Sequence, residues 1–253
     1  MRLSAGKVEP RWLAADGMEA ARSRQATYRL LAAMFLYPSH DRLERLRALA
    51  RELSEEEDAT AEIAVSPGPG RLLNRLRSLA DLQMEEEYNA LFSVKPKAPP
   101  YESVYVDPEG FNGGWIGVSL ERIYGAAGVG VSENHKETPD HVAVELEFMA
   151  YLCSLEAQAL AERDMTATAR ARQYQAAFLN QHLGLWFAPF AQRVREASPG
   201  SHYDAVADAA DSFVAQELGS LGAGAPPSKP RIPRNGRAEL LEGEATTSTG
   251  FPG

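Results

Sequence analysis

The chain has 253 residues, of which 44% are hydrophobic and 24% charged, a composition typical of globular proteins that excludes a collagen-like or wholly disordered chain. A formal net charge of −9 disfavours a general nucleic-acid binder, because phosphate contacts need a basic face. The single cysteine, Cys153, rules out an internal disulfide and a cysteine-rich metal site.

Neither a membrane span nor a secretory signal is predicted. The longest plain apolar run covers residues 30–37, far short of the roughly 18 residues that cross a bilayer. The N-terminal residues lack the apolar stretch of about 7–15 residues that marks a secretory signal. We therefore expect a cytoplasmic protein without stable membrane insertion.

Apolar residues recur with helical periodicity, and strand signals are nearly absent. The predicted fold class is all-α, a single-domain bundle of about seven to nine helices. A first helix is expected over about 17–36 and ends before Pro38, and Ser39 can cap a second helix. A third helix is expected from about residue 71 to 92.

The stretch from Val94 to Gly114 holds four prolines and three glycines, which predicts a long connection that is ordered at least in part. Loops of this length in compact domains are often functional. A shorter helix is predicted over about 116–127, and the glycines that follow it end the periodic pattern.

The next helix is predicted to begin at Thr138, a good N-cap, with Pro139 at the first helical position and Asp140 at the positive end of the helix dipole. Its apolar residues cover more than one side, which indicates a central helix. Two or three further helices are expected, over about 166–183, 185–197 and 202–221.

The last part of the chain differs in composition from the rest. Residues 221–253 hold six glycines and five prolines but only one aromatic residue, which predicts a flexible tail. The predicted organisation is therefore an N-terminal extension over 1–19, a helical domain over 20–220 and a disordered Gly/Pro-rich tail over 221–253.

The common phosphate-binding loops and the nucleophile elbow of hydrolases are absent. His141 and Glu145 are four positions apart, with Glu137 nearby, so one alternative is a small helical metalloenzyme or hydrolase that uses His141 and Glu145. No second carboxylate–histidine pair accompanies them, and a lone pair at this spacing is more often a charge contact. A generic helical adaptor is another alternative.

Three segments occur in an order found in one known family. They are residues 87–92 (Glu-Tyr-Asn-Ala-Leu-Phe) followed by 100–105 (Pro-Tyr-Glu-Ser-Val-Tyr), then 137–149 (Glu-Thr-Pro-Asp-His-Val-Ala-Val-Glu-Leu-Glu-Phe-Met), and finally 178–182 (Phe-Leu-Asn-Gln-His) with Trp186 and Phe190 after it. Together they resemble the TorD/DmsD/NarJ family of redox-enzyme maturation chaperones. The resemblance covers roughly residues 26–218, and its specific part is the middle segment.

The resemblance implies an all-helical cytosolic chaperone that is not an enzyme and needs no cofactor or metal of its own. Its expected partners are the twin-arginine leader and the apoprotein of a molybdenum-cofactor oxidoreductase subunit of the DMSO-reductase type. The chaperone would hold this subunit until its cofactor is inserted and it can be exported. A monomer and a swapped dimer are both compatible with the sequence.

The resemblance also implies which residues bind the leader. Pro139, Asp140 and His141 match the leader-binding hot spot of the family. A neighbouring family motif in the long loop is matched by Tyr101, Glu102 and Tyr105.

A twin-arginine leader presents two guanidinium groups followed by an apolar stretch, so its receptor needs an apolar groove with carboxylates at one end. Asp140 and Glu145 are the predicted guanidinium contacts. The competing interpretation is that Asp140 only caps its helix and His141 only packs in the core.

Overall fold

The computed structural model describes residues 16–48, 81–107, 114–131, 137–221 and 238–240. The helical elements in these ranges are α1 (Asp16–Met34), a helical segment over 40–48, α4 (Asp81–Tyr88), the π-helical turn η2 (Asn89–Ser93), α5 (Glu102–Val106), α6 (Gly114–Ala127), α7 (Val142–Ala161), α8 (Met165–Gln181), α9 (Leu183–Ala197) and α10 (His202–Leu221). Two short strands, β1 (Val129–Val131) and β2 (Ala238–Leu240), pair in parallel. The predicted all-α bundle is confirmed, with this small strand pair added to it.

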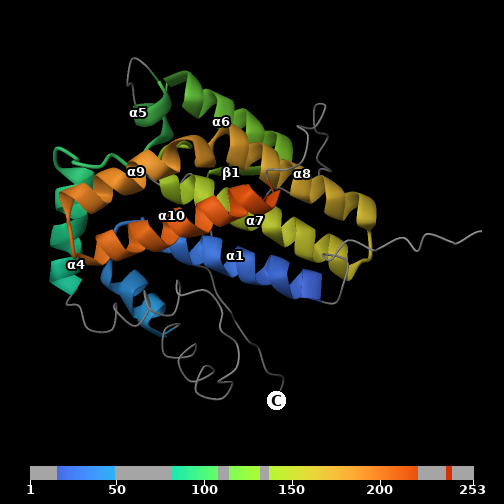
Figure 1. The fold of residues 1–253 in the computed structure, drawn as a ribbon, viewed down its shortest axis with the longest axis horizontal. Coiled ribbons are helices and arrows are strands. Elements are labelled where there is room, and N and C mark those ends of the chain that lie inside the picture. The colour runs from blue at the N-terminus through green and yellow to red at the C-terminus, as the bar shows by residue number, and fades with distance from the viewer. Residues whose placement is uncertain (1–15, 49–80, 108–113, 132–136, 222–237, 241–253) are drawn as a thin grey trace, which may run out of the picture.

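Helix α7 is the central element of the bundle. Helix α1 packs along it, α8 packs against it from another direction, and α10 pairs with α9 (Figure 1). Every residue from Val142 to Leu146 is buried, so the start of α7 presents no face to solvent. The prediction of a central helix is therefore confirmed, because only a helix with neighbours on all sides can bury apolar residues around its whole circumference.

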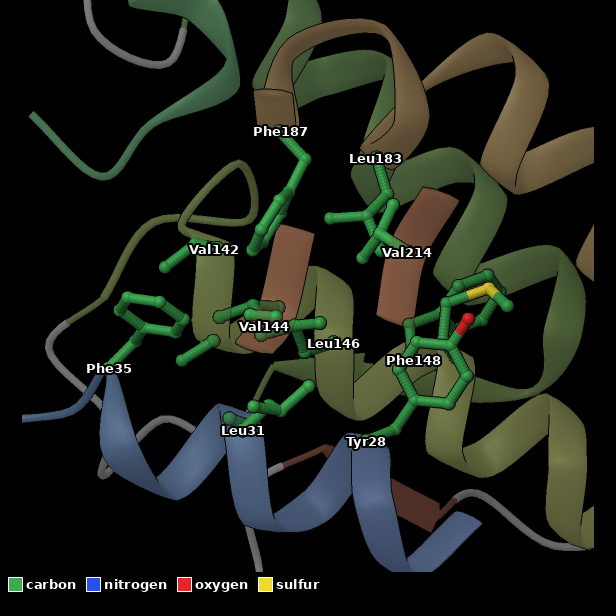
Figure 2. Close-up of a cluster of buried hydrophobic side chains, with 14 of the residues drawn as sticks. Tyr28, Leu31, Phe35, Val142, Val144, Leu146, Phe148, Leu183, Phe187 and Val214 are labelled. Carbon is green, nitrogen blue, oxygen red and sulfur yellow. The ribbon is translucent and has the colours of Figure 1, made fainter. Parts of the chain in front are cut away.

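The core lies between α1 and α7 and is closed by α9 and α10. Tyr28 and Leu31 of α1 and Phe35 just after it follow helical spacing and point toward α7, opposite Leu183, Phe187 and Val214 (Figure 2). Large aromatic side chains contact one another edge to face, as do Phe35 and Phe190 at 5.4 Å between ring centroids. Fully burying a side chain of this size contributes about 1.5–3 kcal/mol.

A buried charged network fixes how four helices sit relative to one another. Arg24 of α1 donates hydrogen bonds to Glu156 of α7 at 2.9 Å, to Glu217 of α10 at 2.7 Å and to Gln175 of α8 at 2.5 Å. Arg172 of α8 also donates to Glu156, at 3.0 Å. Because the two carboxylates are almost completely buried, loss of Arg24 would leave Glu217 without this ion-pair partner inside the bundle, while Glu156 would keep Arg172.

The helix boundaries predicted within the described ranges agree with the structure to within two residues, except at the start of the central helix. Helix α7 begins at Val142, and its N-cap is His141, whose Nδ1 accepts the Ala143 N–H at 3.1 Å. The prediction of Thr138 as the N-cap was wrong. Pro139 and Asp140 form a turn instead, because the Asp140 carbonyl accepts a hydrogen bond from Glu102 and cannot continue a helix.

Two further features differ from the sequence prediction. The glycine-containing break after α6 forms β1, and residues 238–240 of the predicted disordered tail form β2, with Val129 opposite Ala238 and Val131 opposite Leu240. The long loop over 94–114 contains the short helix α5. The start of the helix expected near residue 71, the extension over 1–15 and the rest of the tail lie outside the described residues.

Candidate functional site

The candidate site forms where the segment around α5 meets the turn before α7. The Val142 N–H donates to the Pro100 carbonyl at 2.8 Å, and the Glu102 N–H donates to the Asp140 carbonyl at 2.9 Å. Between these two bonds Tyr101 and His141 form an isolated antiparallel bridge. The two segments that the sequence singled out, 100–105 and 137–149, are therefore hydrogen-bonded to each other through their backbones.

Asp140 is completely buried at this junction. Its Oδ2 accepts the Ser103 hydroxyl at 2.5 Å and the Ser103 N–H at 3.4 Å, and its Oδ1 accepts the Thr138 hydroxyl at 2.6 Å. A buried carboxylate needs such donors, because an uncompensated charge in the interior is costly. Asp140 therefore joins α5 to the turn before α7 and presents neither oxygen to solvent.

His141 is also completely buried. Besides capping α7, its ring meets the Tyr101 ring edge to face, with centroids 5.3 Å apart. The other nitrogen, Nε2, lies 3.6 Å from Glu137 Oε2. The imidazole thus links the N-terminus of α7 to two side chains nearer the surface.

Two further buried acids, Glu102 and Glu145, lie close to this junction. Glu145 is completely buried and its Oε2 accepts the Trp186 indole N–H at 3.1 Å, while the Glu102 carboxylate lies 3.1 Å from His182 Nδ1. Burial and the nearby charge of Glu102 raise the pKa of Glu145 well above its ordinary value of 4.5. The proton-bound form of Glu145 is therefore favoured, and this side chain faces the interior.

Two tyrosines of this region are only partly buried. Tyr105 is half-buried and stacks on Trp186, with centroids 5.5 Å apart, and the Arg193 guanidinium carbon lies 5.0 Å from the Tyr105 ring centroid. Tyr101 is likewise half-buried. Pro139 is partly exposed, and its carbonyl accepts the Tyr124 hydroxyl at 2.9 Å. Tyr101, Tyr105 and Pro139 are therefore partly exposed apolar residues of the segments that hold the buried acids.

Glu137 is a further acidic residue of the junction. From the sequence alone, it had a role only in the metalloenzyme alternative. Its side chain is 23% exposed. Burial and the nearby charge of Glu137 raise the pKa of Tyr101 to about 12. Burial raises the pKa of Glu137, while the Tyr101 hydroxyl and the charge of Arg42 lower it. The signal in the sequence was its position four residues before His141.

The geometry does not support a metal site built on His141 and Glu145. His141 directs Nε2 toward Glu137, whereas Glu145 bonds to Trp186. Within the part of the chain that the structure describes, no group of three His, Cys, Asp or Glu side chains could hold a metal ion. In the same residues no helix is long and apolar enough to cross a membrane.

Comparisons with known proteins point to the same family as the motif segments do. The family model described as nitrate reductase delta subunit matches residues 44–192, which include α5, the start of α7 and Trp186. The chain is 34% identical to the chaperone protein TorD of Vibrio cholerae over 149 residues, 57% of this chain and 66% of that one. The aligned part thus spans just under two thirds of the length of that relative.

Two other relatives extend this result. TorD of Shewanella loihica is 27% identical over 220 residues, which are 82% of this chain and 97% of that one. The selenate reductase assembly chaperone protein of Thauera selenatis is 33% identical over 147 residues, 56% of this chain and 72% of that one. The names of all three relatives describe chaperones rather than catalysts.

Proposed function

Because the chain belongs to the nitrate reductase delta subunit family, the TorD/NarJ family of redox-enzyme maturation chaperones, we propose that it binds the twin-arginine leader and the apoprotein of a DMSO-reductase-type molybdoenzyme subunit. It acts in the cytoplasm and holds this subunit until the molybdenum cofactor is inserted and export can begin. Its role is assembly and not catalysis.

The observation that carries this proposal is the meeting of the two motif segments. Residues 100–105 and 137–149 are far apart in the sequence, yet two backbone hydrogen bonds and the Ser103–Asp140 contact join them. A region that only had to fold into a helix would not need buried acids at this point, since buried charges are costly without partners. The junction is therefore better explained as a site whose shape is held for a partner.

The chemistry of the junction suits a leader of this kind. A guanidinium group binds carboxylates through charge-assisted hydrogen bonds, and an apolar stretch binds aromatic surface. Here Glu137 lies near the half-buried Tyr101, and the half-buried Tyr105 stacks on Trp186, which donates a hydrogen bond to Glu145. We assign the partly exposed Tyr101, Tyr105 and Pro139 to the contact surface and the buried Glu102, Asp140, His141 and Glu145 to the support beneath it.

Affinity purification of the tagged full-length chain from its native host tests the proposal. We expect it to recover one molybdoenzyme catalytic subunit that still carries its leader. The matched control expresses the same subunit without the leader, and its recovery should fall strongly. Recovery that does not depend on the leader would favour a generic helical adaptor instead.

A second measurement uses purified components. A synthetic leader peptide should bind the full chain, and replacement of its arginine pair by lysines should weaken binding, since lysine cannot form the bidentate contact of a guanidinium with a carboxylate. A peptide with the same composition in scrambled order is the control. Equal affinity for the leader and the scrambled peptide would contradict the proposal.

A further inference from the structure

The acidic residues around the start of α7 differ greatly in their access to solvent. An arginine that arrives from outside needs a carboxylate oxygen that it can reach. The side chain of Glu102 is 3% exposed, and Asp140 and Glu145 are completely buried. Glu137 has a side-chain exposure of 23%. Of these four acidic side chains, Glu137 alone is accessible.

The three buried acids are also occupied by partners within the chain. Glu102 lies against His182, Asp140 accepts hydrogen bonds from Ser103 and Thr138, and Glu145 accepts one from Trp186. A leader arginine could reach them only if α5 separated from the turn before α7. Such a separation would break the backbone hydrogen bonds that connect these segments.

Glu137 lies against ordered neighbours before any ligand arrives. His141 Nε2 lies 3.6 Å from its Oε2, and the charge of Glu137 acts on the Tyr101 hydroxyl, whose pKa it helps to raise. Tyr101 itself is fixed by its backbone bridge to His141. A carboxylate that is already oriented loses less conformational freedom when it binds a guanidinium, which favours affinity.

A guanidinium group of the chain already lies within electrostatic range of Glu137. Arg42, in the helical segment 40–48, lies near enough that its positive charge lowers the pKa of Glu137. The Arg42 guanidinium also donates a hydrogen bond to the Tyr37 carbonyl. Since the side chain of Glu137 is mostly shielded from water, an ion pair there is weakened less by solvent than one on an open surface.

We propose that Glu137 is the carboxylate that receives an arginine of the leader, and that Tyr101, Asp140 and His141 act through it as positioning residues. This inference rests on the proposed function, because it names the charge contact of the same site. The guanidinium contact that the sequence predicted at Asp140 and Glu145 is thereby reassigned to Glu137, which lies nearer the surface.

The test compares two peptides, the leader with its arginine pair and the same leader with two lysines, by titration against full-length variants. Glu137→Gln removes the charge and keeps a side chain of nearly the same shape. We expect it to weaken binding of the arginine peptide about 10- to 100-fold, in line with the loss of a charge-assisted hydrogen bond. Binding of the lysine peptide should change much less, so the preference for arginine should nearly disappear.

Two other variants serve as controls. Glu121→Gln makes the same charge change on the exposed face of α6 and should leave both affinities and their ratio unchanged. Tyr101→Phe keeps the ring but removes the hydroxyl on which the Glu137 charge acts, and it should lower the preference for arginine by a smaller factor. Circular dichroism and thermal melting check that each variant is folded.

The outcomes separate the two proposals. If the wild-type chain binds the arginine peptide and Glu137→Gln keeps the same arginine-to-lysine ratio, the assignment of Glu137 is wrong while the proposed function stands. If the wild-type chain binds neither peptide, the proposed function fails and this inference fails with it. If Glu137→Gln does not fold, an unchanged ratio in Tyr101→Phe overturns the assignment.

Discussion

Ser103 and Asp140 are 37 positions apart in the sequence, yet the Ser103 hydroxyl donates to Asp140 Oδ2 across 2.5 Å in the interior of the protein. This contact joins α5 to the turn before the central helix. Because Asp140 also accepts the Thr138 hydroxyl at 2.6 Å, its carboxylate both stabilises its own turn and holds that turn to α5. An acidic residue that the sequence suggested for ligand contact is therefore part of the folded framework.

Asp140→Asn should consequently destabilise the protein, although the sequence alone predicts a small effect. An asparagine offers one acceptor oxygen and one NH₂ group, so one of its two hydroxyl partners loses its acceptor. We expect the free energy of unfolding to fall by about 1–3 kcal/mol. Urea titration measures it, and Ser103→Ala with the double variant completes a mutant cycle. Fully additive effects would show that the two side chains are not coupled.

Glu145→Gln should change how stability depends on pH. Glu102, Asp140 and Trp186 face this carboxyl group, and burial raises its pKa above the value in the unfolded chain. The folded state therefore retains a proton that the unfolded chain releases, so this contribution is complete below about pH 4.5 and is lost as pH rises through the raised pKa. Because the glutamine side chain stays neutral, the variant should gain stability relative to wild type as pH increases.

Urea titrations between about pH 5 and pH 8 measure this difference. Glu121→Gln, a charge change on the exposed face of α6, is the matched control and should follow the wild-type profile. Parallel profiles for Glu145→Gln and wild type would mean that Glu145 ionises normally in the folded protein.

Gly184→Ala should be destabilising, because the added methyl group has no room. A Cβ atom at this position of α9 would lie 2.5 Å from the Leu179 carbonyl oxygen and 2.8 Å from a Leu218 methyl group. Overpacking of this kind typically costs about 1–3 kcal/mol. Gly125→Ala in α6 is the control: nothing lies within 4 Å, so alanine should stabilise that helix by up to about 1 kcal/mol. Equal melting temperatures for both variants would contradict the expectation.

Removal of residues 222–253 tests how much the C-terminal segment contributes to the fold. The truncation deletes β2, which pairs with β1 over three residues, and leaves α1, α7, α9 and α10 complete. Because the hydrophobic core lies among these helices, we expect the melting temperature to change by no more than a few degrees. A larger drop, measured by circular dichroism, would show that β2 belongs to the stable folded unit.

The sequence by itself determined most of the helices within the described ranges, with α5 and the start of α7 as exceptions. Helix α10 begins at His202 and ends at Leu221 as its periodicity predicts, and the apolar circumference of α7 indicates its central place. These properties are local, because the spacing of apolar residues and the turn-forming residues between helices act within a few positions. From the sequence, the resemblance to a family also assigned segments 100–105 and 137–149 to one binding site.

Only the tertiary structure decided where α7 begins and which acidic residues reach solvent. Thr138 and Asp140 satisfy every local rule for a helix start, but Asp140 bonds to Ser103 and Glu102 instead, and His141 takes the N-cap. Likewise β1 acquires its strand partner only from residues 238–240. Whether a side chain is buried depends on which distant segment packs over it, so the contrast between buried Asp140 and accessible Glu137 arises only when α5 lies against the start of α7.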